Sequence, residues 1–185
     1  MESAIHISVQ PTPNPNTLKF VVNTLLLEEG TADFSSREEA AGSPLALKLF
    51  DVPSVAAVFV GLNFISVTKT PTANWNELAN PLTTTIRSAL VEGLGVTATT
   101  KASVASEGSD RDVEQRVRDI LDREIRPAVA MDGGDITFHS YKDGIVTLHL
   151  QGACSSCPSS VLTLRMGVEH RLREMIPEVK EVVQV

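Results

Sequence analysis

The stretch that decides the fold of the second half of this chain is MDGGDITFHSYKDGIVTLHLQGACSSCPSSVLTLRMGVEHRL, residues 131–172. It contains two runs that alternate apolar and polar residues, ITFHSY and IVTLHL, with Lys142-Asp143-Gly144 between them. An Asp-Gly pair between two such runs is a strong signal for a β-hairpin. The hairpin leads into QGACSSC, which we interpret as a loop, and then into a segment whose apolar residues have helical spacing.

Working outward from this stretch, we expect a helix before the hairpin, and a helix and a strand after it. The first helix is interrupted or kinked at Pro127, because proline lacks the N–H that a helix interior needs. The second helix begins at Pro158 and is stopped by Pro177, and residues 179–185 follow as the last strand. The two apolar helix faces are marked by Val113, Val117, Ile120, Leu121 and Ile125, and by Val161, Leu164, Val168, Leu172 and Met175. Residues 111–185 are therefore predicted to form a small domain of α-β-β-α-β order.

The first half of the chain, residues 1–92, predicts a separate small α+β domain. Strands are expected at 5–10 and 17–23, with the loop PTPNPN between them, and a hairpin at 55–60 and 63–69. Helices are expected at 43–50, with Ser43 as N-cap, and at 74–92.

Residues 93–110, GLGVTATTKASVASEGSD, separate the two halves. The segment is rich in Thr, Ala, Ser and Gly and lacks apolar periodicity, so it buries too little to offset the entropy of ordering it. We interpret it as a flexible linker. The predicted fold class is thus α+β, with two small domains joined by this linker.

Composition excludes several kinds of partner. The 185 residues carry 16 basic and 23 acidic side chains, a net charge of −7, and aromatic residues make up only 4%. A nucleic acid or an anionic membrane would favour a basic surface, so neither is expected as a partner. The longest apolar stretch is too short and too interrupted to span a bilayer.

The N-terminus has no basic region followed by an apolar core, so no signal peptide is expected. Two cysteines cannot form the disulfide framework of a small secreted domain. We expect a cytoplasmic protein of bacterial type, with the mitochondrial matrix as the alternative if a transit peptide has been removed.

Cys154 and Cys157 are the candidate site, since a CxxC turn can direct both sulfurs at one metal or join them in one disulfide. The following Pro158 places them at a helix N-terminus, which favours thiolates. Zinc or an iron–sulfur cluster takes four ligands, so one chain supplies half of them. A two-fold dimer would supply all four. A redox dithiol, a zinc module and incidental cysteines remain the alternatives. Flanking serines predict an exposed loop.

Other candidate residues in the same stretch have simpler explanations. Gly133-Gly134 and Gly152 are typical of turns that need a positive φ, although Gly152 could also keep the loop slim. Asp132 and Asp135 are interpreted as turn caps rather than as an acid–base pair. The histidines of this half, His139, His149 and His170, are interpreted as ordinary core or surface residues.

The motifs MDGGDITF, LQGACSSCPSSVLTLRMGVEHRL and IPEV resemble the C-terminal domain of NifU and of the Nfu iron–sulfur scaffold proteins. QPTPNPNTLKF resembles the hallmark of the Nfu N-terminal domain. The resemblance implies a scaffold or carrier rather than an enzyme. Its cargo would be a labile [4Fe–4S] cluster, with [2Fe–2S] as the alternative, held by Cys154 and Cys157 and bridging a homodimer.

The same resemblance implies the partners. An upstream assembly scaffold would donate the cluster, and apo iron–sulfur proteins would accept it. Residues 1–92 contain no cysteine and would dock partners, while residues 111–185 would bind the cluster. A CxxC dithiol oxidoreductase is the alternative from another functional class.

Overall fold

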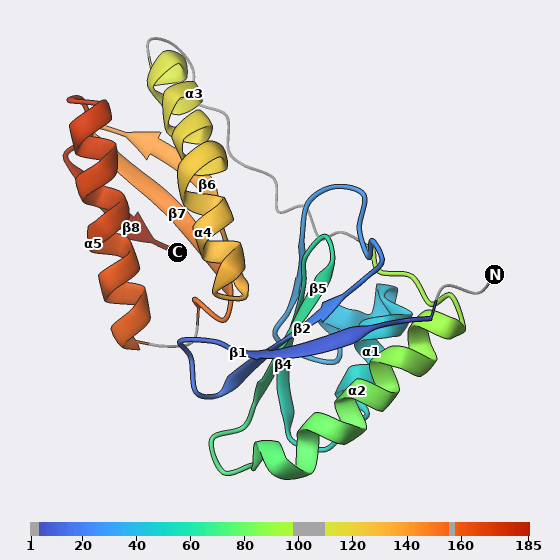
Figure 1. Ribbon diagram of the computed structural model, residues 1–185. Coiled ribbons are helices and arrows are strands. Elements are labelled where there is room, and N and C mark those ends of the chain that lie inside the picture. The colour runs from blue at the N-terminus through green and yellow to red at the C-terminus, as the bar shows by residue number, and fades with distance from the viewer. Residues whose placement is uncertain (1–3, 98–109, 156–157) are drawn as a thin grey trace. The chain divides into compact units, whose positions relative to one another are not determined.

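The computed structural model describes residues 4–97, 110–155 and 158–185, of which 158–160 are described by their backbone alone. The chain divides into two compact units, Met1–Thr100 and Lys101–Val185 (Figure 1). Each unit combines helices with a sheet, which confirms the α+β fold class and the two domains. Most of the predicted linker, residues 98–109, lies outside the described residues, so its flexibility and the domain boundaries stay predictions.

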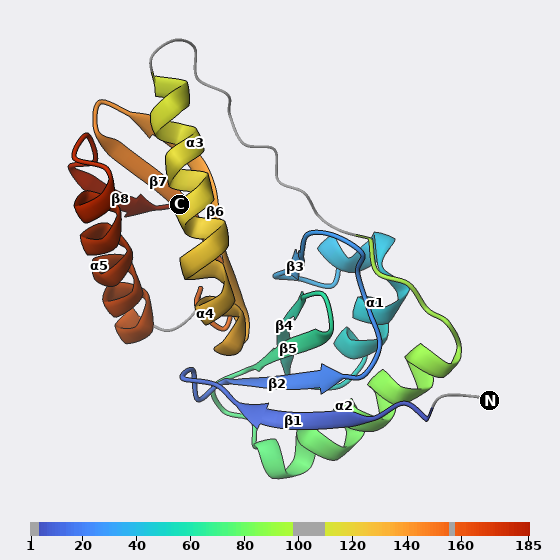
Figure 2. The same cartoon turned by 45° about the horizontal axis from the view of Figure 1, so that its top comes forward.

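The first unit is a five-stranded antiparallel sheet of order β1-β2-β5-β4-β3 with two α-helices on one face (Figure 2). Alternate residues of β2, β4 and β5 enter one core with the apolar faces of α1 and α2. The elements are β1 (Ile7–Pro11), β2 (Thr17–Val22), β3 (Ala32–Phe34), a 3₁₀ turn at Glu39–Gly42, α1 (Pro44–Phe50), β4 (Val55–Val60), β5 (Phe64–Lys69) and α2 (Trp75–Val91). The predicted strands, hairpin and helices are present, and only β3 and the 3₁₀ turn were not expected.

The two helices of this unit begin differently. Asn74 caps α2, since its side chain accepts a hydrogen bond from the N–H of Asn76 at 3.1 Å. Ser43 lies at the N-cap position of α1, but its side chain makes no capping hydrogen bond. The position predicted for Ser43 is therefore right and the predicted capping contact is not made.

Glycine ends α2. Gly93 has a φ of 69°, the N–H of Leu94 donates to the carbonyl of Ala89 at 2.9 Å, and that of Gly93 donates to Leu90 at 3.1 Å. This pair of bonds is a Schellman cap, which satisfies carbonyls that the helix end leaves over. Leu94 and Val96 still pack on the first core beyond the cap.

The second unit has the predicted α-β-β-α-β order, with a three-stranded sheet β6-β7-β8. β6 and β7 pair antiparallel and β7 and β8 pair parallel. The elements are α3 (Asp110–Ile120), a π-helical turn (Leu121–Ile125), α4 (Arg126–Met131), β6 (Gly134–Lys142), β7 (Ile145–Gly152), α5 (Pro158–Met175) and β8 (Glu181–Gln184). Val146, Leu148 and Leu150 of β7 share one core with residues of α3 and α5, so these helices cover the same face of the sheet.

The prolines act as expected, and one core residue was misplaced. The π-helical turn at Leu121–Ile125 ends two residues before Pro127, whose ring would clash in a regular helix with the carbonyl four residues earlier. Met175, predicted in the core, is 45% exposed, and Ile176 is buried instead. Ile176 lies four residues after the buried Leu172, and its N–H still donates to the Leu172 carbonyl at 2.7 Å, so Ile176 rather than Met175 continues the buried face.

Candidate cysteine site

The cysteine loop leaves the sheet at the end of the β6–β7 hairpin. Gly134 is paired with Gly152 in the last register position, and Gly152 has a φ of 66°. The loop then folds back on itself: the N–H of Ala153 donates to the carbonyl of Gly133 at 3.2 Å, and the hydroxyl of Ser155 donates to that of Gly152 at 2.9 Å. Gly133 also has a positive φ, 82°, so the turn interpretation is confirmed for Gly133 and Gly152.

Cys154 is buried, and this corrects the expectation of an exposed loop. Its exposed fraction is 7% and it belongs to the second core, whereas the neighbouring Ser155 is exposed. The cause is Gly134. A Cβ on Gly134 would lie 2.8 Å from the Cys154 sulfur and 2.6 Å from the carbonyl oxygen of Gln151. The missing side chain at Gly134 therefore makes the space that the thiol occupies.

This gives Gly134 a different reason from the one predicted. Gly134 is the first residue of β6 and is not among the glycines with positive φ. Close approach of a sulfur, not turn geometry, requires glycine here. The loop-slimming role predicted for Gly152 thus belongs to Gly134, on the neighbouring strand.

Cys157 lies outside the described residues. The structure thus positions one of the two predicted ligands, and α5 begins at Pro158 as expected. The pairing of Cys154 with Cys157 in one site stays a prediction.

Asp135 is not the turn cap that the sequence predicted. It lies in β6, its exposed fraction is 3%, and its carboxylate accepts two hydrogen bonds from Arg126, from Nε and Nη2, each at 2.8 Å. It also accepts the N–H of Ile136 at 2.8 Å. This bidentate pair ties α4 to the sheet directly beside Gly134. Hydrogen bonding to Asp135 raises the pKa of Arg126 above its ordinary high value, so the guanidinium stays charged.

Sequence reasoning missed Arg126 because nothing in its spacing from Asp135 indicates a contact. Asp132, by contrast, lies at the C-terminal end of α4, in the turn where it was expected.

The histidines add no ligand set. Nδ1 of His139 is 3.3 Å from the Ser140 hydroxyl, Nδ1 of His149 is 2.9 Å from the carbonyl of Val185, and His170 is exposed. Within the described ranges no group of three or more His, Cys, Asp or Glu side chains could hold a metal ion. In that part of the chain, Cys154 therefore does not belong to a group of three or more potential ligands.

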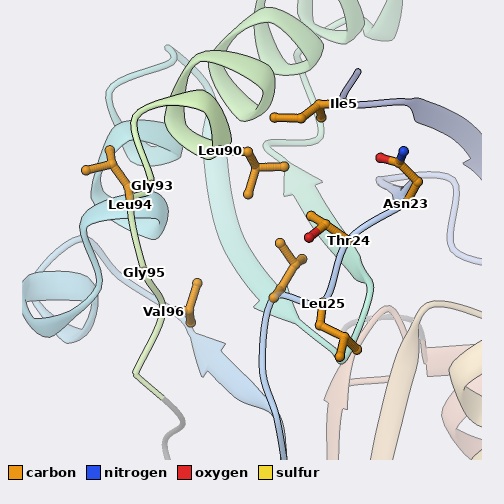
Figure 3. Close-up of a pocket in the computed structure, with 10 residues that line it drawn as sticks. Ile5, Asn23, Thr24, Leu25, Leu90, Gly93, Leu94, Gly95 and Val96 are labelled. Carbon is orange, nitrogen blue, oxygen red and sulfur yellow. The ribbon is translucent and has the colours of Figure 1, made fainter. Parts of the chain in front are cut away.

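A pocket of about 460 Å³ lies in the first unit (Figure 3). Leu25, Leu90 and Leu94 line it together with the polar Asn23 and Thr24. Both ends of the Asn23 amide are used within the protein, by the N–H of His6 and the carbonyl of Ala4.

None of the helices in the described residues has the length and apolar content that crossing a membrane would need.

The fold and the site place this chain in the class of two-domain proteins in which an α+β domain precedes a NifU-like domain of α-β-β-α-β order. Residues 117–183 match the family described as NifU-like domain, and residues 7–93 match the one described as scaffold protein Nfu/NifU N terminal. The chain belongs to the Nfu family of iron–sulfur cluster scaffold proteins.

The relatives that match this sequence align with nearly its whole length. The human protein named NFU1 iron-sulfur cluster scaffold homolog, mitochondrial, is 44% identical over 181 residues, which cover 97% of this chain and 71% of the human protein. Its counterpart in Drosophila persimilis is 42% identical over 185 residues, covering 98% of this chain and 66% of the fly protein. The solution structure of a NifU-like protein from Saccharomyces cerevisiae is 25% identical, with a TM-score of 0.47, over 54% of this chain and 92% of that one.

Proposed function

We propose that this protein carries a labile [4Fe–4S] cluster, with [2Fe–2S] as the alternative, and delivers it to apo iron–sulfur proteins. Cys154 and Cys157 of two copies would hold the cluster between them. The observation that carries the proposal is the cysteine loop at the end of the β6–β7 hairpin, in a chain of the Nfu family. We propose a carrier rather than an enzyme, since a protein that passes on a cluster turns over no small-molecule substrate.

The donor count supports a shared cluster. A cluster of this kind takes four ligands, thiolates as a rule. The chain has two cysteines, and among its described residues no group of three or more His, Cys, Asp or Glu could hold a metal ion. A second copy related by two-fold symmetry supplies the missing pair without any further residue type.

The setting of Cys154 supports lability. Its sulfur packs against Gly134 in the second core, so we propose that the side chain turns outward to bind iron. A ligand that regains a buried position on leaving the metal favours release. Exchange with an incoming thiolate of an acceptor can then proceed one ligand at a time.

The first unit would serve in docking rather than in ligation, because it contains no cysteine. The cluster would come from an upstream assembly scaffold. The relatives named above are mitochondrial. For this chain we propose a cytoplasmic location of bacterial type or the mitochondrial matrix.

Anaerobic reconstitution with ferrous iron and sulfide tests the function. We expect a brown protein with one cluster for every two chains, and transfer of that cluster to an apo-acceptor. A dithiol oxidoreductase would instead stay colourless and cycle a disulfide with a reductant. A zinc module would take up zinc and no sulfide. Either result would overturn the proposed carrier.

A further inference from the structure

Exposed apolar side chains lie at the ends of α4 and α5 that are next to the cysteine loop. Met131, the last residue of α4, is 77% exposed, and Leu162 and Met166 in the first half of α5 are 51% and 62% exposed. Both helix ends lie beside the cysteine loop. The carbonyl of Gly133, two residues after Met131, accepts a hydrogen bond from the N–H of Ala153, and α5 starts at Pro158, directly after Cys157 in the sequence. We call Met131, Leu162 and Met166 the apolar collar.

On α5, the collar occupies only the end near the cysteine loop. Leu162, Met166, His170 and Arg173 follow one another along a single face, because they are spaced four, four and three residues apart. The two nearest the cysteine loop are apolar and the two farther away are polar. Helical rise places Leu162 about 6 Å and Met166 about 12 Å along the axis from Pro158.

The surface beside Met166 is also open. A Cβ on Gly167 would meet no atom within 4 Å. Glycine in a helix interior destabilises it relative to alanine, so local helix stability does not explain the residue. Its absence of a side chain leaves room for another backbone to come close.

We propose that the apolar collar is covered by a second copy of this chain when the cluster bridges two protomers. The inference rests on the proposed function. Two cysteines per chain require a second copy, and each copy's α5 begins one residue after Cys157. Two loops that share a cluster therefore bring two collars to the same place. A two-fold axis sets the same patch against itself, and an apolar patch is complementary to itself.

The collar also fits reversible assembly. Three side chains form a smaller apolar surface than the patches that hold stable dimers, so the cluster-free protein stays monomeric. The cluster and the collar then act together, and neither alone holds the dimer.

The test compares the full chain with L162Q/M166Q, which removes the apolar surface without adding charge near the thiolates. Glutamine has nearly the helix propensity of leucine and methionine, so the helix is retained. M175Q is the matched control, since Met175 is 45% exposed on the same helix but at its far end. Circular dichroism of the cluster-free proteins checks that all three fold alike.

After anaerobic reconstitution, sedimentation over a range of concentrations gives the dimer dissociation constant. We expect L162Q/M166Q to raise it by more than about tenfold, since four apolar side chains per dimer are lost, and M175Q to leave it unchanged. An unchanged dimer dissociation constant in L162Q/M166Q would overturn the assignment of the collar to the dimer interface and leave the proposed function standing. If the L162Q/M166Q dimer had that unchanged constant and also transferred its cluster slowly, the collar would bind an acceptor protein and not a second copy. A brown monomeric wild type would overturn the second copy as occupant, and a colourless wild type would overturn the proposed function itself.

Discussion

The sulfur of Cys154 rests against the backbone of Gly134, at a point where a Cβ would lie only 2.8 Å from it. A residue 20 positions earlier in the chain therefore makes room for the first cysteine of the CxxC loop. The contact links the edge strand of the sheet to the loop, and it makes Gly134 as much a part of the site as the cysteines.

Gly134→Ala should destabilise the second unit by about 1–3 kcal/mol, because the new methyl group overpacks the sulfur and the Gln151 carbonyl. Gly167→Ala is the control: it has open space and should stabilise by about 0.5–1 kcal/mol. Urea unfolding followed by two signals distinguishes the two units. The single Trp, Trp75, lies in the first unit, so the unfolding transition seen by its fluorescence should be the same in the variants and the wild type, whereas circular dichroism reports the unfolding of both units. A wild-type transition for Gly134→Ala would contradict the close contact.

Asp135→Asn should cost about 1.5–3 kcal/mol in the unfolding of the second unit, because it weakens two hydrogen bonds to a charged, partly buried Arg126. Arg126→Gln should cost more, since it leaves the 3% exposed carboxylate without its guanidinium. The exposed pair of Arg171 and Glu124 serves as control, and Arg171→Gln should change little. A double-mutant cycle measures the coupling, and additive effects of the two substitutions would refute it.

Cys154→Ala and Cys157→Ala should each abolish stable cluster binding, because one substitution removes two of the four thiolates of a symmetric dimer. Iron and sulfide counts after anaerobic reconstitution measure this. Ser155→Ala, in the same loop, should keep the wild-type counts. An iron content equal to that of the wild type in either cysteine variant would contradict the proposal that two copies share one cluster.

Residues 111–185 alone should fold and bind the cluster, and the first unit alone should fold and stay colourless. Leu94 and Val96 pack on the first core, so a fragment ending at residue 97 should be more stable than one ending at residue 92. Limited proteolysis of the full chain should cut first between Gly93 and Asp110. An earlier cut inside either unit would contradict the linker.

Transfer from the full chain to an apo-acceptor should be faster than transfer from residues 111–185, because docking by the first unit raises the local concentration of acceptor. Transfer rates at matched cluster concentration measure the difference, with a small chelator as the reference that needs no docking. Equal rates for every acceptor would remove the docking role and leave the role of the cysteines standing.

Local patterns determined most of the fold. Alternating apolar residues around Asp143-Gly144 predicted the β6–β7 hairpin, and helical spacing predicted α2, α3 and α5. Proline marked the start of α5, and the motifs around the cysteine pair identified the family. Such features depend on residues that are neighbours in the chain, so they can be predicted without knowing what packs on what. The three-residue β3 was missed because it is too short to show a period.

Only the tertiary structure decided what surrounds Cys154. The burial of its thiol, the need for glycine at position 134 and the pairing of Arg126 with Asp135 were all mispredicted or missed. Each depends on the register that sets Gly134 opposite Gly152 and on α4 packing beside β6. The sequence shows that these residues are small, acidic or basic, but it does not show which of them contact one another. The contacts join segments that are far apart in the chain, and they form only when the sheet and its helices pack together.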